Sequence, residues 1–381
     1  MRILMVHDPG AGPGGIETYL AHLEQGLRAR GHQPSRFAPP RTGDAAAVAS
    51  AAAACRELRP ELVHVHRLEN PELYRALRRE APLVQSIHDH RACCPGATRL
   101  RRDGRACTRV AGEACTVQGV LGRCAGVPRW PQLAWSRVAG WKAWTAAIDR
   151  DAPVVVASRF VRDVLVGQGW SGAAIHVLPY PLPFDADPPP SAAESSTVLF
   201  AGRLVEPDKG VELFVDVFER LPPATRGVIA GDGPARARIE RLLRQRSLAD
   251  RVVLTGWLDG ERLRARFREA AVVVMTSRWP EPSGLAGLEA LMQARPVVAT
   301  DVGGVAEWLR DGEFGYRLPA SEPAVLADRV RSLLADPALR GAMGRAGREW
   351  VRSHRGVDRH LDAIEALYEA AAAPPRRVAI A

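Results

Sequence analysis

The chain alternates between short apolar segments and segments of helical periodicity, and it does so in two separate series. The apolar segments of the first series lie at residues 3–6, 62–65, 83–87, 154–157 and 175–178. The second series starts at Val198 and continues through the C-terminal half. Strands that alternate with helices predict parallel sheets built from βαβ units. We therefore expect an α/β fold with two doubly wound, Rossmann-like domains that face each other across a cleft.

The two series also place the domain boundaries. The first domain is expected at residues 1–180 and the second at 197–372, joined by the proline-rich segment 181–196, which has no apolar periodicity. We expect the last helix to be able to pack back on the N-terminal domain. No apolar run approaches the ~18–20 residues that span a bilayer, and residues 1–8 are typical of a strand rather than a signal peptide. The expected location is the cytoplasm.

The positive charge of the chain is concentrated in one half. Residues 1–180 hold 24 Lys and Arg against 15 Asp and Glu, whereas residues 181–381 hold 28 of each kind. A basic half favours an anionic partner, such as a phospholipid surface or a lipid-linked phosphate. A biased amino-acid composition explains the excess equally well, because Lys142 and Lys209 are the only lysines in an arginine-rich chain.

Cysteines are clustered in one segment, 91–127, which reads as an insert because it has little apolar material for a core. Four of them could form a tetrahedral thiolate site, and we expect a structural zinc ion there. The spacings do not fit the compact C-x₂-C pairs of known zinc modules, so disulfides and free thiols remain alternatives. The proposed ligands are Cys94, Cys107, Cys115 and Cys124.

Two glutamates, Glu281 and Glu289, lie eight residues apart behind the apolar segment 271–275. The first carboxylate is expected in the loop that follows this strand, and the second on the helix that follows the loop. The helix N-terminus, with Ser283 as its expected cap, would point free N–H groups at the space between them. This arrangement suits a diphosphate with a sugar on one side and a ribose on the other.

Other loops that follow predicted strands hold suitable residues. Arg203 and Lys209 lie six residues apart and follow the predicted strand that ends at Phe200. Two such cations suit the binding of a diphosphate. The pair Gly303-Gly304 permits a close approach of backbone to a ligand. His88 directly follows the strand 83–87; a single histidine is more often structural than functional.

Together these segments resemble the GT4-type retaining glycosyltransferases of the GT-B fold, and the resemblance covers nearly the whole chain. The matching segments are the pair Glu281 and Glu289, Gly202-Arg203-Leu204 with Lys209-Gly210, Gly231-Asp232-Gly233-Pro234, Thr300-Asp301-Val302-Gly303-Gly304 with Glu307, Gly14-Gly15-Ile16-Glu17, and His88-Asp89. The chain departs from the family pattern at Ser283, where phenylalanine is usual, and at residues 293–295.

The resemblance implies a role for each matching residue. Arg203 and Lys209 would hold the donor diphosphate, Glu281 would bind hydroxyls of the transferred sugar, and Glu289 would bind the nucleotide ribose. The remaining contacts that it implies are backbone amides of Ser283, Gly284 and Leu285, the loop at Gly14 and Gly15, and His88 from the opposite domain.

The reaction that the resemblance implies is the transfer of a sugar from a UDP- or GDP-linked donor to an acceptor hydroxyl, with retention of anomeric configuration. It would serve cell-surface glycan or natural-product glycoside synthesis. Arg203, Lys209 and the helix N-terminus would stabilise the charge on the leaving diphosphate without a metal, so we expect catalysis without a metal or other cofactor. The acceptor stays open between a glycan, a lipid-linked molecule and a small molecule, and a nucleic-acid partner is not expected.

A tryptophan-rich segment at residues 130–150 bears on the acceptor side. Tryptophans beside basic residues suit contact with an anionic membrane, which would place the protein at the inner membrane face. Alternatively, the segment is a packed helix whose Val138, Trp141, Trp144 and Ile148 fill the core.

Two other functions fit parts of the sequence. Gly10-x-Gly12-x-x-Gly15 after a first strand matches the fingerprint of dinucleotide-dependent oxidoreductases, but residues 33–40 lack the acidic side chain that holds a ribose. A sugar-nucleotide binding protein without catalysis is the second alternative, and hydrolysis of a nucleotide sugar would distinguish the enzyme from it.

Overall fold

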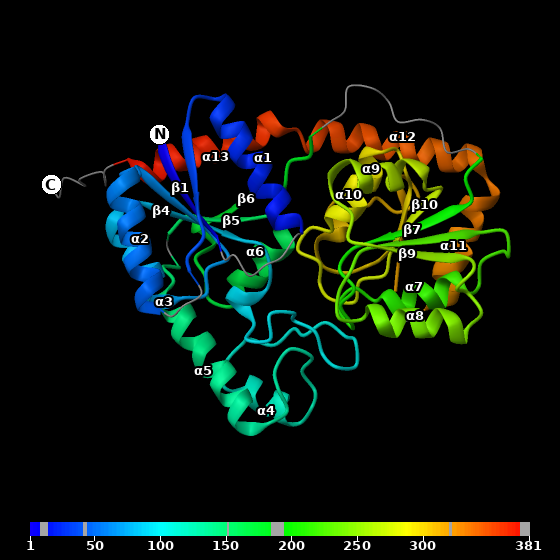
Figure 1. Ribbon diagram of the computed structural model, residues 1–381, viewed down its shortest axis with the longest axis horizontal. Coiled ribbons are helices and arrows are strands. Elements are labelled where there is room, and N and C mark those ends of the chain that lie inside the picture. Colours follow the sequence, from blue (N-terminus) through cyan, green and yellow to red (C-terminus); the bar gives the residue numbers. More distant parts are fainter. Residues whose placement is uncertain (8–13, 41–43, 151, 184–193, 320–321, 374–381) are drawn as a thin grey trace.

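The computed structural model describes residues 1–7, 14–40, 44–150, 152–183, 194–319 and 322–373. It consists of two domains side by side, each a parallel sheet with helices on its faces (Figure 1). The expected α/β fold with two Rossmann-like domains is confirmed. Most of the expected linker, residues 184–193, lies outside the described residues.

The N-terminal sheet has the strand order β2-β1-β3-β4-β5-β6, and every neighbouring pair is parallel. Its strands are β1 (Arg2–His7), β2 (Gln33–Phe37), β3 (Leu62–His66), β4 (Leu83–Ile87), β5 (Val154–Val156) and β6 (Ile175–Val177). Its helices are α1 (Gly15–Ala29), α2 (Asp44–Leu58), α3 (Pro71–Glu80), α4 (Ala114–Val120), α5 (Pro131–Ala147) and α6 (Arg159–Val166).

The C-terminal sheet has the order β12-β11-β10-β7-β8-β9, again parallel throughout. Its strands are β7 (Thr197–Ala201), β8 (Arg226–Ala230), β9 (Val252–Gly256), β10 (Val272–Met275), β11 (Val297–Thr300) and β12 (Gly315–Leu318). Its helices are α7 (Val211–Phe218), α8 (Arg236–Gln245), α9 (Gly260–Glu269), α10 (Leu285–Met292), α11 (Pro323–Ala335) and α12 (Pro337–His354). One more helix, α13 (Val357–Ala372), follows α12.

Strands of both sheets are apolar because helices cover both faces. All four residues of β10 are buried, as are all five of β3, even though β3 carries His64 and His66. Near-continuous apolar strands are typical of parallel sheets with two covered faces. α2 is a helix for which the sequence analysis had no prediction. Its alanine-rich sequence has little contrast between its faces, with Ala47, Ala51 and Cys55 as its buried residues.

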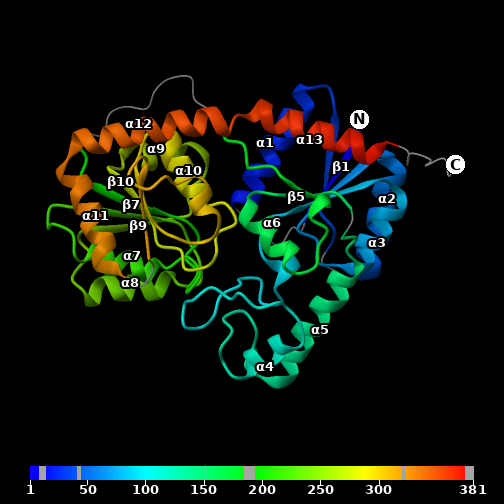
Figure 2. The ribbon, with the colours of Figure 1, turned by 180° about the vertical axis from the view of Figure 1, so that it is seen from behind.

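The last helix, α13, crosses from the C-terminal domain and lies on the N-terminal one (Figures 1 and 2, red). Its Leu361 and Ile364 belong to the same buried cluster as Ile3 and Tyr19. At its exposed side, Arg30 of the N-terminal domain forms salt bridges with Asp358, Asp362 and Glu365. The first strand and the last described helix therefore belong to the core of one domain.

The cysteine-containing insert 91–127 projects away from both sheets, with α4 at its far end (Figures 1 and 2). The expected zinc site is not supported. Within the described part of the chain, no three His, Cys, Asp or Glu side chains are grouped so that they could hold a metal ion. The proposed ligands Cys94, Cys107, Cys115 and Cys124 are free thiols.

Backbone contacts hold the insert together in place of a metal. Leu100 pairs with Ala106 and Arg101 with Cys124 in antiparallel bridges. Gly96 and Gly126 pack so closely that a Cβ on Gly126 would lie 2.0 Å from the Gly96 carbonyl oxygen. Burial raises the pKa of the Cys94 thiol to about 11, so it stays uncharged at neutral pH.

The expected packing of the tryptophan-rich helix is correct for part of its length. Val138, Trp144 and Ile148 are buried, and Trp141 is half-buried. Trp130 and Trp135 near its start are exposed by 72% and 67%, which leaves two large apolar side chains without a core. Among the described helices, none has the length and apolarity to cross a membrane.

Candidate functional site

Glu281 lies in the loop that joins the carboxyl end of β10 to α10, and it is buried. The helix begins one residue later than expected. Gly284 is its N-cap, with φ of 78°, and no side chain caps it. The expected capping role of Ser283 is therefore wrong. The Ser283 Oγ atom is buried and has no hydrogen-bond partner among the described residues.

A buried ion pair joins two of the expected catalytic residues. Lys209 Nζ lies 2.5 Å from Glu281 Oε1, and Ser277 Oγ donates to the same oxygen over 2.5 Å. Burial alone would raise the pKa of Glu281, but the Lys209 charge and these hydrogen bonds outweigh it, so its pKa lies below the ordinary value. Lys209 Nζ also lies 5.0 Å from the centre of the Trp279 ring.

Arg203 follows β7 at the same edge of the sheet and is exposed. Its side chain forms no hydrogen bond or salt bridge with any residue that the structure describes. Asp208 connects it electrostatically to the ion pair: burial raises the pKa of Asp208, the charges of Arg203 and Lys209 lower it, and Glu281 raises it further. Two cations therefore face the loop that contains Glu281, and Arg203 is the one with its charge open to solvent.

Glu289 lies one turn inside α10, on the helix that follows Glu281. Burial raises the pKa of this carboxyl to about 7, and the positive charge of Arg264 on α9 offsets only part of the shift. A carboxyl with this pKa is a mixture of acid and carboxylate at neutral pH. It gains from any ligand that brings hydroxyl donors to it.

The glycine pair after β11 packs against the loop that contains Glu281. A Cβ on Gly303 would lie 2.3 Å from the Glu281 carbonyl oxygen, and a Cβ on Gly304 would lie 2.7 Å from that of Pro282. The Gly304 N–H donates to the Glu281 carbonyl oxygen over 2.7 Å. The small size of both glycines permits this close approach, and the hydrogen bond fixes the backbone of the loop.

The start of α1 faces the start of α10 across the domains. Gly14 is the N-cap of α1, and a Cβ on Gly15 would lie 2.8 Å from Leu285 Cδ1. Glycine at position 15 thus lets the two helix N-termini approach each other. N–H groups without partners at helix starts favour anions. The backbone of Gly284 and Leu285, which was expected to contact the nucleotide-sugar donor, lies where the two helix starts meet.

His88, the expected histidine, is buried behind the cleft. Its Nε2 shares a 3.1 Å hydrogen bond with His66 Nδ1, and its Nδ1 shares a 2.6 Å bond with Tyr180 Oη. Burial lowers the pKa of His88 to about 4, so the ring is neutral at pH 7. Both ring nitrogens are used within the domain, and the side chain holds the wall of the cleft.

His90, two residues further on, makes the contact across the domains. Its Nε2 donates to the carbonyl oxygen of Pro280 over 2.6 Å, directly before Glu281. The ring lies edge-on to Trp279 and to Phe160. His90 was not expected to have a role, although it follows the same buried strand as His88 and could have been predicted for the same reason.

Glu307 forms a second contact between the domains. Its carboxylate accepts hydrogen bonds from the backbone N–H groups of Arg159 (3.0 Å) and Phe160 (2.7 Å), the first two residues of α6. Ser158 caps the same helix through a bond from the Val161 N–H. A carboxylate of the C-terminal domain thus supplies the anionic cap of an N-terminal helix.

Comparison with known proteins agrees with this geometry. The family model described as "Glycosyl transferases group 1" matches residues 184–350, and "Glycosyltransferase Family 4" matches residues 13–183. A GDP-mannose-dependent alpha-(1-6)-phosphatidylinositol monomannoside mannosyltransferase of Mycolicibacterium smegmatis is 30% identical over 260 residues, which cover 61% of this chain and 68% of the relative. The chain belongs to glycosyltransferase family 4.

A second relative of this family 4 chain is an alpha-D-kanosaminyltransferase of Streptomyces kanamyceticus, 40% identical over 149 residues. That stretch covers 38% of each protein, so the chain spans less than half the length of this relative in the match. Among solved structures, HepE of Anabaena in complex with UDP has a TM-score of 0.70 at 18% identity, over 97% of this chain and all of the other. The match in structure shows the GT-B fold.

We predict that Glu307→Ala opens the two domains of this glycosyltransferase, because two N–H groups of α6 lose an anionic acceptor. Bonds of this kind contribute about 1–3 kcal/mol each when they involve a charged group. Small-angle scattering should show a larger radius of gyration for Glu307→Ala and a smaller change for Glu307→Gln. Glu313→Ala, which removes an exposed glutamate nearby, should scatter like the wild type. Unchanged scattering for Glu307→Ala would contradict the contact.

Proposed function

We propose that the protein transfers a sugar from a nucleotide-diphosphate donor to an acceptor hydroxyl with retention of anomeric configuration. The observation that carries the proposal is the ion pair between half-buried Lys209 and buried Glu281 in the loop before α10, with exposed Arg203 in the same loop as Lys209. The similarity to a GDP-mannose-dependent mannosyltransferase and to a structure solved with UDP supports a UDP- or GDP-linked donor.

The charges of the site suit the bond that would break. Cleavage of the anomeric C–O bond leaves negative charge on the diphosphate, and Arg203, Lys209 and the N–H groups at the start of α10 lie where they would stabilise it. Glu281, held as a carboxylate, would accept hydrogen bonds from hydroxyls of the sugar. The acceptor hydroxyl would attack from the face that the diphosphate leaves, and the departing phosphate would take its proton.

Charge compensation by side chains also supports transfer without a divalent metal. Arg203 can bind two phosphate oxygens at once through its planar guanidinium, and Lys209 acts as a compact point charge. We therefore propose that turnover persists in the presence of a chelator. The same reaction class fits roles in the synthesis of a cell-surface glycan or a natural-product glycoside.

Peripheral contact with an anionic membrane is a further part of the proposal. Exposed large apolar side chains gather at residues 110–135, among them Trp130 and Trp135. The segment 99–142 holds nine Lys and Arg against two Asp and Glu. Tryptophan next to cationic side chains is the composition of interfacial segments, and this lobe projects away from both domains (Figure 1).

We predict that Lys209→Ala and Glu281→Gln each lower the turnover of a nucleotide sugar at least ~100-fold, because each removes one charge from the pair at the reacting centre. Hydrolysis or transfer is measured by release of UDP or GDP from a panel of nucleotide sugars, with a chelator present. Lys142→Ala, which changes the only other lysine, is the matched control and should keep wild-type turnover. Wild-type rates in either site variant, with the fold intact by circular dichroism, would overturn the proposal.

We predict that nucleotide binding releases protons near pH 7. The pKa of Glu289 is raised to about 7 in the free protein, and ribose hydroxyls that donate to it would favour the carboxylate. Binding then weakens as the pH falls below 7 and releases about half a proton per nucleotide at that pH. Calorimetry of UDP and GDP in buffers of different ionisation enthalpy measures this release. The phosphate of the nucleotide titrates with both proteins, so Glu289→Gln should release fewer protons than the wild type by the amount that Glu289 contributes. An equal release in both proteins would contradict the role of Glu289.

We predict that the protein floats with anionic liposomes at low salt and is released at high salt, because its cationic lobe is drawn to the lipid charge. The double variant Trp130→Ser, Trp135→Ser should float less. Trp257→Ser removes an exposed tryptophan of the C-terminal domain and should behave like the wild type. Absence of the wild type from the liposome fraction would argue against the membrane contact.

A further inference from the structure

One turn of the insert 91–127 contacts the C-terminal domain, although α4 projects away from it. Figures 1 and 2 show a loop of the insert (cyan) that reaches from the N-terminal domain toward the C-terminal one. In the turn 101–105, a Cβ on Gly104 would lie 3.0 Å from Nη1 and 3.6 Å from Cδ of Arg278. Arg278 belongs to the donor loop (residues 276–284, between β10 and α10), which also contains Glu281. Glycine at position 104 thus lets the arginine stem lie against the turn.

The turn 101–105 is held in shape by its own hydrogen bonds. The Arg101 N–H donates to the Arg105 carbonyl oxygen over 2.8 Å, and the Gly104 N–H donates to the Arg101 carbonyl oxygen over 3.0 Å. Asp103 accepts from the Arg105 N–H over 3.1 Å and forms a 3.0 Å salt bridge with Arg101. The turn therefore presents a defined surface to the donor loop.

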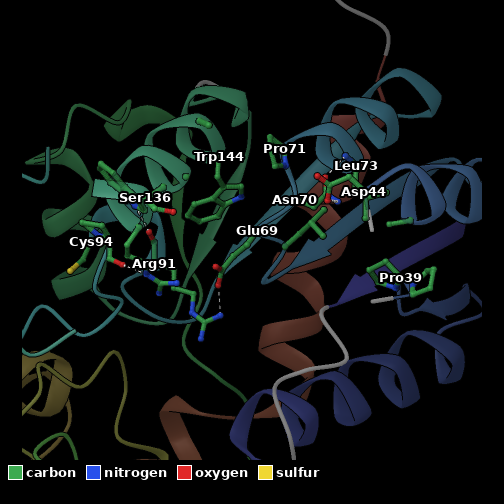
Figure 3. A pocket seen from close by; sticks show the side chains of 18 residues that line it. Pro39, Asp44, Glu69, Asn70, Pro71, Leu73, Arg91, Cys94, Ser136 and Trp144 are labelled. Atoms are coloured by element: carbon green, nitrogen blue, oxygen red, sulfur yellow. Dashed lines mark hydrogen bonds and ion pairs between the residues drawn. The ribbon is translucent and has the colours of Figure 1, made fainter. Parts of the chain in front are cut away.

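The beginning of the insert is fixed to the N-terminal domain beside a cavity. Figure 3 shows Arg91 and Glu69, which form an ion pair between the insert and the loop after β3. The Arg91 carbonyl oxygen also accepts from Trp141 Nε1 over 2.7 Å, and Arg137 Nε donates to the Pro95 carbonyl oxygen over 2.8 Å. Trp141 and Arg137 both lie on α5. The insert is thus anchored on one domain while its turn contacts the other.

Arg278 is attached to the loop that contains Lys209. The N–H groups of Arg278 and Trp279 both donate to the carbonyl oxygen of Asp208, over 2.9 Å and 3.2 Å. A Cβ on Gly210 would lie 3.6 Å from Arg278 Cγ. The Arg278 side chain therefore contacts two segments, the turn of the insert and the loop after β7.

The charge of Arg278 also acts on the loop after β7. Glu206 Oε1 accepts from the Glu212 N–H over 2.9 Å, in the first turn of α7. Burial raises the pKa of Glu206, and the positive charge of Arg278 offsets part of the shift. Arg278 therefore favours the carboxylate that holds the start of α7, the helix that begins two residues after Lys209.

We infer that the insert is a clamp on the donor loop and that Arg278 is the positioning residue through which it acts. The turn 101–105 holds the Arg278 side chain. The hydrogen bonds to the Asp208 carbonyl oxygen pass this constraint to the Lys209–Glu281 pair, which is completed between the two loops. The clamp keeps ammonium and carboxylate in fixed geometry while the domains are in contact. Its effect on turnover rests on the proposed glycosyl transfer.

Gly104→Arg tests the clamp at the turn. The new side chain starts toward the Arg278 guanidinium and brings a like charge to it. A residue with a side chain at the Gly104 φ of 81° also strains the backbone, so the control needs the same strain. Gly31 has φ of 84°, and a Cβ added there meets no atom within 4 Å. Gly31→Arg therefore carries the same charge and the same strain without the contact.

Hydrogen exchange on the full chain measures the donor loop directly. The amides of Arg278 and Trp279 should exchange ~10-fold faster in Gly104→Arg than in the wild type, because their loop opens more often. Gly31→Arg should exchange like the wild type. Arg278→Ala breaks the same contact from the other side, so it should speed exchange by itself, and Gly104→Arg should add nothing to it. Wild-type exchange in both Gly104→Arg and Arg278→Ala, or equal acceleration in Gly31→Arg, would overturn the inference.

Steady-state kinetics separate the clamp from the proposed function. A residue that only stabilises the fold leaves the kcat of the folded protein unchanged. We expect the kcat of Gly104→Arg and Arg278→Ala for a nucleotide sugar to fall ~10-fold with KM within ~2-fold, and Gly31→Arg to match the wild type. If the wild type has no turnover while exchange changes as described, the glycosyl-transfer proposal fails and the clamp stands. If the wild type is active and both variants keep its kcat, the positioning role fails and the transfer stands.

Discussion

The structure of the site depends on one buried charge. A carboxylate as deeply enclosed as Glu281 is stable only with compensation. Lys209 supplies it from the loop after β7 and Ser277 from the end of β10, while the Gly304 N–H after β11 fixes the backbone carbonyl of Glu281. Because these groups follow three neighbouring strands, an intact sheet is needed to hold the carboxylate in place.

The same loop connects the two domains. The carbonyl oxygens of two consecutive residues, Pro280 and Glu281, accept from His90 of the N-terminal domain and from Gly304 of the C-terminal one. Glu307, a few residues beyond Gly304, caps α6 across the cleft. The position of the donor loop is thus coupled to the relative position of the domains, and opening of the cleft would release the backbone on which the Glu281 carboxylate is held.

Burial separates the expected site residues into two kinds. Arg203 is exposed and has its charge open to solvent, so it can meet a ligand. His88 has both ring nitrogens engaged within its domain. The position of a residue after a strand therefore indicates that it lies near the cleft. Only the hydrogen bonds and ion pairs of its side chain indicate whether that side chain is free to face a ligand.

The sequence by itself determined the two parallel sheets and the edge at which the functional residues gather. Strand and helix periods are local, and the carboxyl ends of parallel strands share an edge, so Arg203, Lys209 and Glu281 could be predicted to converge. The α2 helix was missed because its alanines give little periodic contrast. The tertiary structure alone decided that His90 holds the loop before Glu281, that Glu307 caps α6 and that the described cysteines of the insert are not grouped as a metal site. These depend on contacts between segments far apart in the chain, and no local pattern of residues encodes how two domains or a projecting insert are placed.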